Sequence, residues 1–187
     1  FDPRFNVARL TVEIFGTVPD EPLTPRVICL GEGRQMQLHR IELSTATRVA
    51  AQAHVLLVRD AETPAFAPPC DYPHPDALED CGFMVGASMA GAIRSRGVVG
   101  GVRQPGRGIV WLACDGEIIA GSKPSPFVKA ALFADFGNGV GSATTGDDWS
   151  FANLDITLQF LRMPIGEWLL IDAETHMAGN GHGTASN

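Results

Sequence analysis

One carboxylate stands out as a candidate for chemistry in this chain of 187 residues. Asp135 lies in the last turn of residues 127–136, a segment that is otherwise mostly apolar and helix-compatible. The helix macrodipole disfavours a carboxylate at a helix C-terminus, so the position invites a functional reason. A carboxylate with an adjustable pKa can act as a general base that activates water. The alternative is a structural carboxylate bonded to the backbone of the following loop.

Two polar side chains occur further along the chain, on the polar face of a predicted strand at residues 152–160. Asn153 can hold a water or a carbonyl group by hydrogen bonds, but it cannot remove a proton near neutral pH. Asp155 lies on the same face and is a candidate substrate contact. A solvated sheet face is the alternative explanation for both residues.

A glycine-rich segment, Gly137-Asn138-Gly139, directly follows the predicted helix. A phosphate-binding glycine loop comes before its helix, so this order does not fit such a loop. We expect Gly137 to end the helix in a left-handed conformation. We also expect the backbone of this segment to approach a substrate carbonyl closely.

Other chemistries lack their residue patterns. No Gly-x-Ser-x-Gly motif of a serine hydrolase is present. The four cysteines have no zinc or redox spacing, and Cys29 and Cys114 lie in apolar, strand-like runs, so buried reduced thiols are expected. We expect no metal and no cofactor, because the histidines have no metal-binding spacing: His39, His54, His74, His176 and His182.

Composition narrows the class of protein. Hydrophobic residues make up 45% of the chain and charged residues 19%, which is typical of a globular protein. The formal net charge of -7, without a basic cluster, argues against a nucleic-acid partner. No apolar run approaches the roughly 18 residues of a membrane helix. No signal peptide is recognisable, so a cytoplasmic location is expected.

Hydrophobic alternation predicts an antiparallel meander before residue 60, with strands at residues 7–15, 26–30, 34–44 and 47–59. In the third strand the apolar phase slips after Leu38 to Ile41, as a β-bulge would cause. Five prolines within residues 61–80 predict a linker without regular structure.

The second part of the chain contains one convincing helix, at residues 125–136. Ser125 can cap its N-terminus, and Pro126 fits the first helical position. Strands are predicted at residues 108–114, 152–160 and 167–177, whereas residues 83–104 are ambiguous.

A weak internal repeat relates the two parts. Residues 10–14 resemble residues 156–160, so Thr11 maps onto Thr157 with an offset of 146. The helix at 125–136 then has no counterpart after Phe1, and the strand at 47–59 maps beyond Asn187. We therefore expect the first repeat to lack its helix and the second to lack its last strand.

These residues resemble the acyl-CoA thioesterase II-like family. The resemblance implies an α+β double hotdog fold, in which each antiparallel sheet wraps a central helix. We expect an N-terminal half at residues 1–60, a linker at 61–80 and a C-terminal half at 81–187. The matching motifs are Ser125-Pro126, the run from Ala134 to Gly139, Trp149-x-Phe151-x-Asn153-x-Asp155-x-Thr157, Arg162, Pro164, Gly166-Glu167-Trp168, and the opening run from Val7 to Glu13.

The resemblance also implies a function, because the family hydrolyses fatty acyl-CoA thioesters to free acid and CoA. Its helix aspartate matches Asp135, its threonine position falls on Asn153, and its glutamine would lie past Asn187. The hypothesis is that Asp135 activates water, Asn153 helps to place that water, and backbone amides form an oxyanion site. The expected substrate contacts are Gly137, Asn138, Gly139 and Asp155. Apolar side chains of the sheet and helix would line an acyl tunnel.

Two alternatives remain open. A non-catalytic acyl-CoA or acyl-chain binding protein of the same fold is favoured by Asn153. A hotdog hydratase or dehydratase would usually need a histidine, and none is near Asp135 in sequence. Arg94, Arg96, Arg103 and Arg107 form a loose basic group that could meet CoA phosphates, although a solvated surface is expected there. The family analogy further suggests a homodimer.

Overall fold

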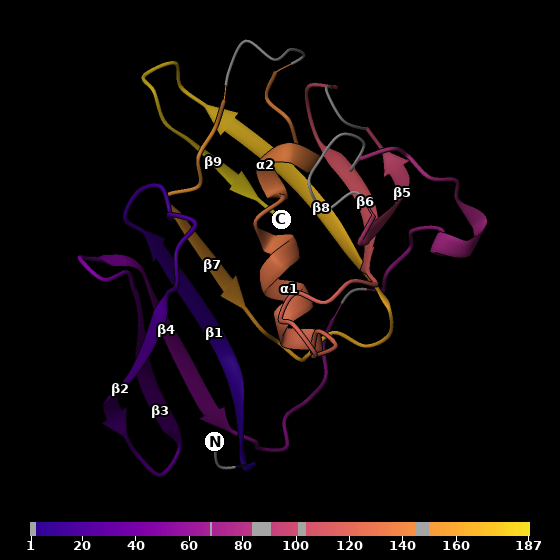
Figure 1. The fold of residues 1–187 in the computed structure, drawn as a ribbon. Helices are drawn as coiled ribbons and strands as arrows, with labels where there is room; N and C mark the ends of the chain where they lie inside the picture. Colours follow the sequence, from indigo (N-terminus) through magenta and orange to yellow (C-terminus); the bar gives the residue numbers. More distant parts are fainter. Residues whose placement is uncertain (1–2, 68, 84–90, 101–103, 145–149) are drawn as a thin grey trace. The chain divides into compact units, whose positions relative to one another are not determined.

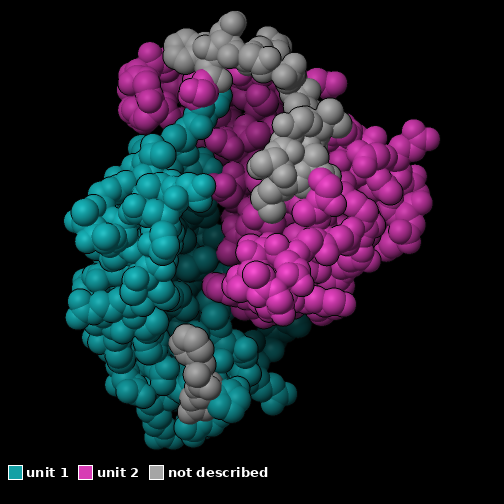
Figure 2. All heavy atoms as spheres, viewed as in Figure 1, with its two compact units in different colours: residues 1–67, 151–162 teal, residues 68–150, 163–187 magenta. Residues whose placement is uncertain are grey.

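The computed structural model describes residues 3–67, 69–83, 91–100, 104–144 and 150–187 (Figure 1). The chain divides into two compact units, each built from two segments (Figure 2). Unit 1 comprises Phe1–Ala67 and Phe151–Arg162, and unit 2 comprises Pro68–Ser150 and Met163–Asn187. Each unit contains its own antiparallel sheet.

Unit 1 is a five-stranded antiparallel sheet with the order β2-β3-β4-β1-β7. Its described residues form no helix, as the repeat predicts for the first half. All four strands predicted before residue 60 are present. The strands are β1 (Phe5–Ile14), β2 (Thr24–Glu32), β3 (Met36–Ser44), β4 (Val49–Arg59) and β7 (Asp155–Gln159).

The order of these strands differs from the predicted meander. Strands β2, β3 and β4 follow one another, but β1 lies beside β4 and not beside β2. Pro25 helps to explain the difference, because it lies within β2 and has no amide hydrogen to donate. A strand that contains proline is suited to the edge of a sheet, and β2 is an edge strand here.

The bulge predicted in β3 is also misplaced. Strand β3 pairs with β4 in continuous register from Met36 to Leu43. One register shift lies in the neighbouring strand β2, between Cys29 and Gly31, and another lies in the pairing of β3 with β4, between Leu43 and Ser44, after the predicted position. The two apolar phases of β3 therefore belong to opposite faces of one regular strand, because successive side chains alternate between faces.

Strand β7 pairs with β1 in a symmetric register. Thr157 lies opposite Thr11, the residue onto which it maps in the repeat. By the same offset, Arg9 maps onto Asp155 and Glu13 maps onto Gln159. The facing pairs Arg9–Gln159 and Glu13–Asp155 are therefore equivalent to each other. This register is what a local two-fold axis between the equivalent strands would produce.

In its described residues, unit 2 combines a four-stranded sheet, in the order β5-β6-β8-β9, with two α-helices. Strand β5 lies in the segment whose sequence is ambiguous, and β9 forms a hairpin with β8. The unit's core joins the sheet to the helices through Ile93, Val110, Leu112, Cys114, Phe133, Val140, Ile171 and Ala173. The elements are β5 (Ile93–Val99), β6 (Gly108–Cys114), α1 (Pro126–Ala134), α2 (Gly137–Val140), β8 (Trp168–Met177) and β9 (Gly183–Ser186).

Helix α1 begins as the sequence predicts and ends differently. Ser125 Oγ accepts a hydrogen bond from the Val128 amide at 3.3 Å, and Pro126 is the first helical residue. Asp135 caps the C-terminus in a right-handed conformation. Gly137 does not terminate α1 in a left-handed conformation but opens the second short helix, α2.

Helix α2 packs against the backbone of the sheet. A Cβ atom on Gly108 of β6 would overlap the carbonyl of Val140, and a Cβ on Gly141 would overlap the carbonyl of Ala173 in β8. Only glycine leaves room for such an approach between main chains. The end of α2 is therefore fixed against both central strands.

The proline-rich segment is fastened along unit 2. It contains a short 3-10 helix (Pro75–Ala77), whereas no regular structure was expected. Trp111 Nε1 donates to the carbonyl of Pro73 at 2.9 Å. Tyr72 donates its hydroxyl to Asp172 Oδ2 at 3.0 Å, and Arg107 Nε donates to Asp172 Oδ1 at 2.6 Å.

We predict that Gly108→Ala destabilises the protein by about 1–3 kcal/mol or more, because overpacking forces backbone shifts. Gly31→Ala is the matched control, since a Cβ there meets nothing within 4 Å. We expect the control to change stability by no more than about 0.5 kcal/mol. Urea unfolding of both variants measures the difference, and equal losses would contradict the close approach of α2.

The hydrogen bonds that Asp172 accepts from Arg107 and Tyr72 predict a pH-dependent contribution to stability. Hydrogen bonds from Arg107 hold the pKa of Asp172 below its usual value, against the effect of burial. A lowered folded-state pKa stabilises the fold above the unfolded-state pKa, and the contribution is lost as pH falls through the folded pKa. Asp172→Asn should therefore lower the melting temperature at about pH 7 and have a smaller effect at about pH 3.

The control for this prediction is Asp76→Asn, because the side chain of Asp76 is 82% exposed. Such an exposed carboxylate contributes little to stability. Melting curves of both variants and the wild type at the two pH values make the comparison. If Asp172→Asn lowers the melting temperature equally at both pH values, the charge of Asp172 does not account for the stabilisation by its pair with Arg107.

Candidate functional site

Asp135 is held at the junction of the two helices of unit 2. Its backbone amide donates to the carbonyl of Leu132 at 3.3 Å, which completes the last turn of α1. The residue is exposed, while Phe133, two positions earlier, is fully buried. Helix α1, which buries Phe133 in the core, thus presents a carboxylate at the surface of its C-terminal end.

The three residues expected to contact substrate after Asp135 are the first residues of α2. Gly137 is buried, Asn138 is half-buried and Gly139 is exposed. The amide of Gly139 donates to the carbonyl of Phe136 at 3.0 Å, and the amide of Gly141 donates to Gly137 at 2.9 Å. These two amides are engaged within the chain, and an oxyanion site formed by backbone amides stays a prediction.

A polar group that the sequence did not single out lies beside this junction. A Cβ on Gly137 would lie 3.1 Å from Cγ of Asn187. The side-chain carboxamide of Asn187 therefore packs against the start of α2, two residues after Asp135. No local motif could have signalled this contact, because it depends on how the β8–β9 hairpin returns to the helices.

The other two candidates belong to unit 1. Asn153 is half-buried and precedes β7, although the predicted strand included it. Asp155 is the exposed first residue of β7 and lies opposite Glu13 of β1. Since Asp135 belongs to unit 2, a joint site of Asp135, Asn153 and Asp155 stays a prediction.

The described arginines of the loose basic group, Arg94, Arg96 and Arg107, all pair with carboxylates. Arg94 Nε donates to Asp115 Oδ2 at 2.5 Å and also pairs with Glu167. The hydrogen bond from Arg94 lowers the pKa of Asp115. Arg96 pairs with Asp80 at 3.5 Å, Arg107 binds Asp172, and Arg103 lies outside the described residues. These pairs favour a solvated surface over a phosphate site.

The cysteines are free thiols, but only Cys114 is buried. The expectation of burial is wrong for Cys29, because β2 is an edge strand whose side chains are largely exposed. Cys70 and Cys81 are also exposed. Within the described ranges, no group of His, Cys, Asp and Glu side chains is arranged to hold a metal ion.

None of the helices in the described ranges has both the length and the apolar character needed to cross a membrane.

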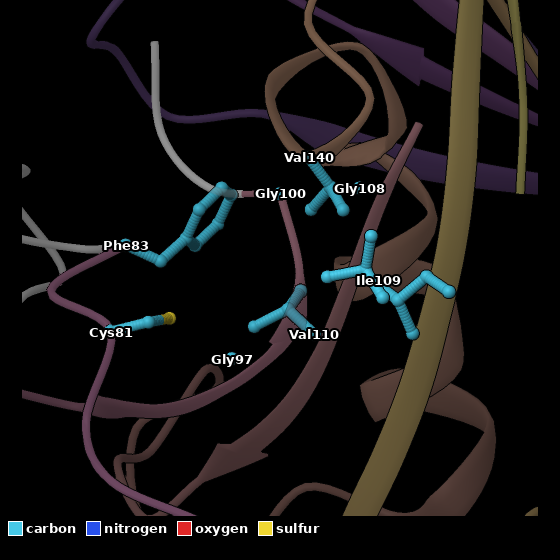
Figure 3. A pocket seen from close by; sticks show the side chains of 9 residues that line it. Cys81, Phe83, Gly97, Gly100, Gly108, Ile109, Val110 and Val140 are labelled. Carbon is cyan, nitrogen blue, oxygen red and sulfur yellow. The ribbon is translucent and has the colours of Figure 1, made fainter. Parts of the chain in front are cut away.

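An apolar hollow in unit 2 is too small for an acyl chain. Phe83 and Cys81 line one side of it, and Val110 of β6 and Val140 of α2 line another (Figure 3). Its volume is about 10 Å³. That is about the least space that holds a single water molecule. The expected acyl tunnel is therefore not this hollow.

Comparison with known proteins identifies the family. The acyl-CoA thioesterase C-terminal domain family matches residues 60–186, more than half of the chain. The chain belongs to this family. No curated protein gives a significant match.

Similar solved structures show that this chain has the hotdog fold. An acyl-CoA thioesterase II from Mycobacterium marinum superposes with a TM-score of 0.76 at 18% identity, covering 99% of this chain and 74% of the other. A tesB protein from Mycobacterium avium subspecies paratuberculosis gives 0.68 at 17% identity, with 100% and 74% covered. A protein of unknown function with a hot dog fold from Alicyclobacillus acidocaldarius gives 0.74 at 17% identity, with 94% and 69% covered.

The predicted fold class is thereby confirmed. Two antiparallel sheets and a central helix in unit 2 are the features that this thioesterase-family chain shares with its hotdog neighbours. At identities below one fifth, these neighbours establish the fold alone.

Proposed function

We propose that this protein hydrolyses acyl-CoA thioesters with a water molecule that Asp135 activates. The observation on which the proposal rests is an exposed carboxylate at the end of a half-buried helix in an acyl-CoA thioesterase-family chain. Hydrolysis needs a base to deprotonate water and a polar environment for the oxyanion. Asp135 meets the first need, and the fixed α1–α2 junction holds it in one place.

The proposed reaction proceeds through a tetrahedral intermediate. Asp135 accepts a proton from water as the water oxygen bonds to the thioester carbonyl carbon. The carbon–sulfur bond then breaks, and the proton passes from Asp135 to the departing CoA thiolate. The products are a free acid and CoA, and no covalent enzyme intermediate is required.

Asn153 would orient the attacking water, as an amide can donate and accept hydrogen bonds without taking a proton. Gly137, Asn138, Gly139 and Asp155 remain proposed substrate contacts. Asn138 is half-buried in α2, and the carboxamide of Asn187 packs against Gly137, so this junction offers neutral polar groups near Asp135.

A second candidate is a non-catalytic acyl-CoA binding protein with the same fold. Asn153 favours it, since an amide replaces the hydroxyl that the family resemblance places there. Both candidates bind acyl-CoA, and only the hydrolase releases free thiol. Thiol release therefore separates them directly.

We predict that Asp135→Asn lowers thiol release by roughly 10² or more, the usual contribution of a positioned general base. The two side chains are nearly isosteric, so the fold should be retained. The acid limb of the pH–rate profile should flatten, because the titrating group is removed. The measurement is thiol release from fatty acyl-CoA, normalised to the folded fraction.

The control for Asp135 is Asp20→Asn, which removes one exposed carboxylate from the loop between β1 and β2. Its normalised rate should match that of the wild type. An unchanged rate for Asp135→Asn would remove Asp135 from the mechanism. Acyl-CoA binding without thiol release by the wild type would support the non-catalytic candidate.

We also propose self-association as a homodimer. Support comes from the edge strand β2, where Val27 is 61% exposed and Leu30 is 46% exposed. Exposed apolar strand edges favour pairing with another chain. Light scattering at micromolar concentration should give the mass of a dimer, and the mass of a monomer would contradict this prediction.

A further inference from the structure

A polar hollow lies at one end of the sheet in unit 1, with a volume of about 210 Å³. Three arginines line it, Arg4, Arg34 and Arg59, and we call it the arginine pocket. Its wall also includes Glu32 and Phe5. Liquid water occupies about 30 Å³ per molecule, so the hollow is large enough for a small anion and part of its hydration.

Strand pairing places the arginines together. Arg59, at the end of β4, lies opposite Phe5, at the start of β1. The amide of Arg59 donates to the carbonyl of Gln35 in the β2–β3 turn at 2.9 Å. Arg34 lies in this same turn, which the Gly33 amide closes by donating to Met36 at 2.8 Å. The ends of neighbouring strands therefore form the rim of the pocket.

Among the described residues that line the arginine pocket, arginines outnumber carboxylates, because Glu32 is the one carboxylate there. That carboxylate has another partner, since Glu32 Oε1 accepts a hydrogen bond from Gln37 Nε2 at 3.3 Å. Gln37 is itself buried, with 9% of its surface exposed, and its Oε1 lies 3.4 Å from His39 Nε2. Glu32 is thus tied to a buried amide.

Two of the arginines differ from the basic residues of unit 2. Among the described residues, the side chains of Arg34 and Arg59 form no hydrogen bond or ion pair with the chain. Arg94 and Arg107 each bind a carboxylate within hydrogen-bond distance. In a chain with a net charge of -7, a hollow where arginines outnumber carboxylates is a place where an anion gains from binding.

We propose that the arginine pocket binds a phosphate group of a small molecule. Guanidinium groups form paired, charge-assisted hydrogen bonds with phosphate oxygens, and several arginines around one hollow can serve the several oxygens of one phosphate. The source of the phosphate is either the acyl-CoA substrate, whose CoA part is phosphorylated, or a separate phosphorylated ligand. Only the first source rests on the proposed function.

The binding test uses inorganic phosphate as the probe. Calorimetric titration at low ionic strength, where charge interactions are least screened, compares the wild type with Arg59→Gln and Arg34→Gln. We expect each pocket variant to bind phosphate at least tenfold more weakly. Arg26→Gln is the matched control, because its side chain is 74% exposed on β2 of the same sheet and does not line the pocket.

Melting temperatures without phosphate report whether each variant is folded. If Arg59→Gln fails to fold, Arg34→Gln in the exposed turn still tests the pocket. Absence of phosphate binding by the wild type would overturn the proposal, as would equal binding by the wild type and folded pocket variants.

Measurements of KM and kcat with two thioesters distinguish the two sources of the phosphate. An acyl thioester of N-acetylcysteamine has the reactive bond of acyl-CoA and no phosphate. A pocket variant that raises KM for acyl-CoA alone, at unchanged kcat, shows that the phosphate is the substrate's. Loss of phosphate binding with unchanged KM for both thioesters supports a separate phosphorylated ligand. The titration needs no hydrolysis, so it tests the pocket even if the proposed function fails.

Discussion

The contact between α2 and the sheet of unit 2 is the constraint on which the candidate site depends. Gly108 and Gly141 lack the Cβ atoms that would collide with the carbonyls of Val140 and Ala173, so main chain packs directly on main chain. Val140 is buried in the same core as Phe133 of α1. Both helices are consequently fixed to the sheet, and the short connection between them has little freedom. The place of Asp135 follows from this packing and not from a left-handed glycine.

Charge is organised differently in the two units. In unit 2, Arg94 and Arg107 reach nearby carboxylates and thereby fix loops and the proline-rich segment to the sheet. Such exposed pairs contribute little stability individually, but they leave no unbalanced charge for a ligand. In unit 1, the strand ends gather Arg34 and Arg59 around a hollow whose carboxylate is bound to Gln37. The first pattern is structural, and the second is suited to binding.

Most elements could be predicted because their side chains alternate or cap locally. Strand β1 has a strong period-two pattern, β4 is rich in Val and Leu, and Ser125-Pro126 marks the start of α1. Strand β5 could not be predicted with the same rules, since glycine and arginine interrupt its apolar residues. Helix α2 was missed because its residues, Gly-Asn-Gly-Val, have low helical preference, and packing on the sheet overrides that preference. Local propensity thus fails where tertiary contacts determine the backbone.

The candidate site was harder to predict because it depends on pairing between distant strands. The alternation of β7 predicted a strand but not its neighbour, and β7 joins β1 in unit 1. The repeat contained the missing information, since Thr11 and Thr157 are equivalent and lie opposite each other. In an antiparallel pair related by a two-fold axis, one equivalent pair faces each other at the centre, and this condition limits the possible registers. The repeat offset, used as a constraint on pairing, would have assigned Asp155 to the sheet of β1, with Asn153 just before the strand.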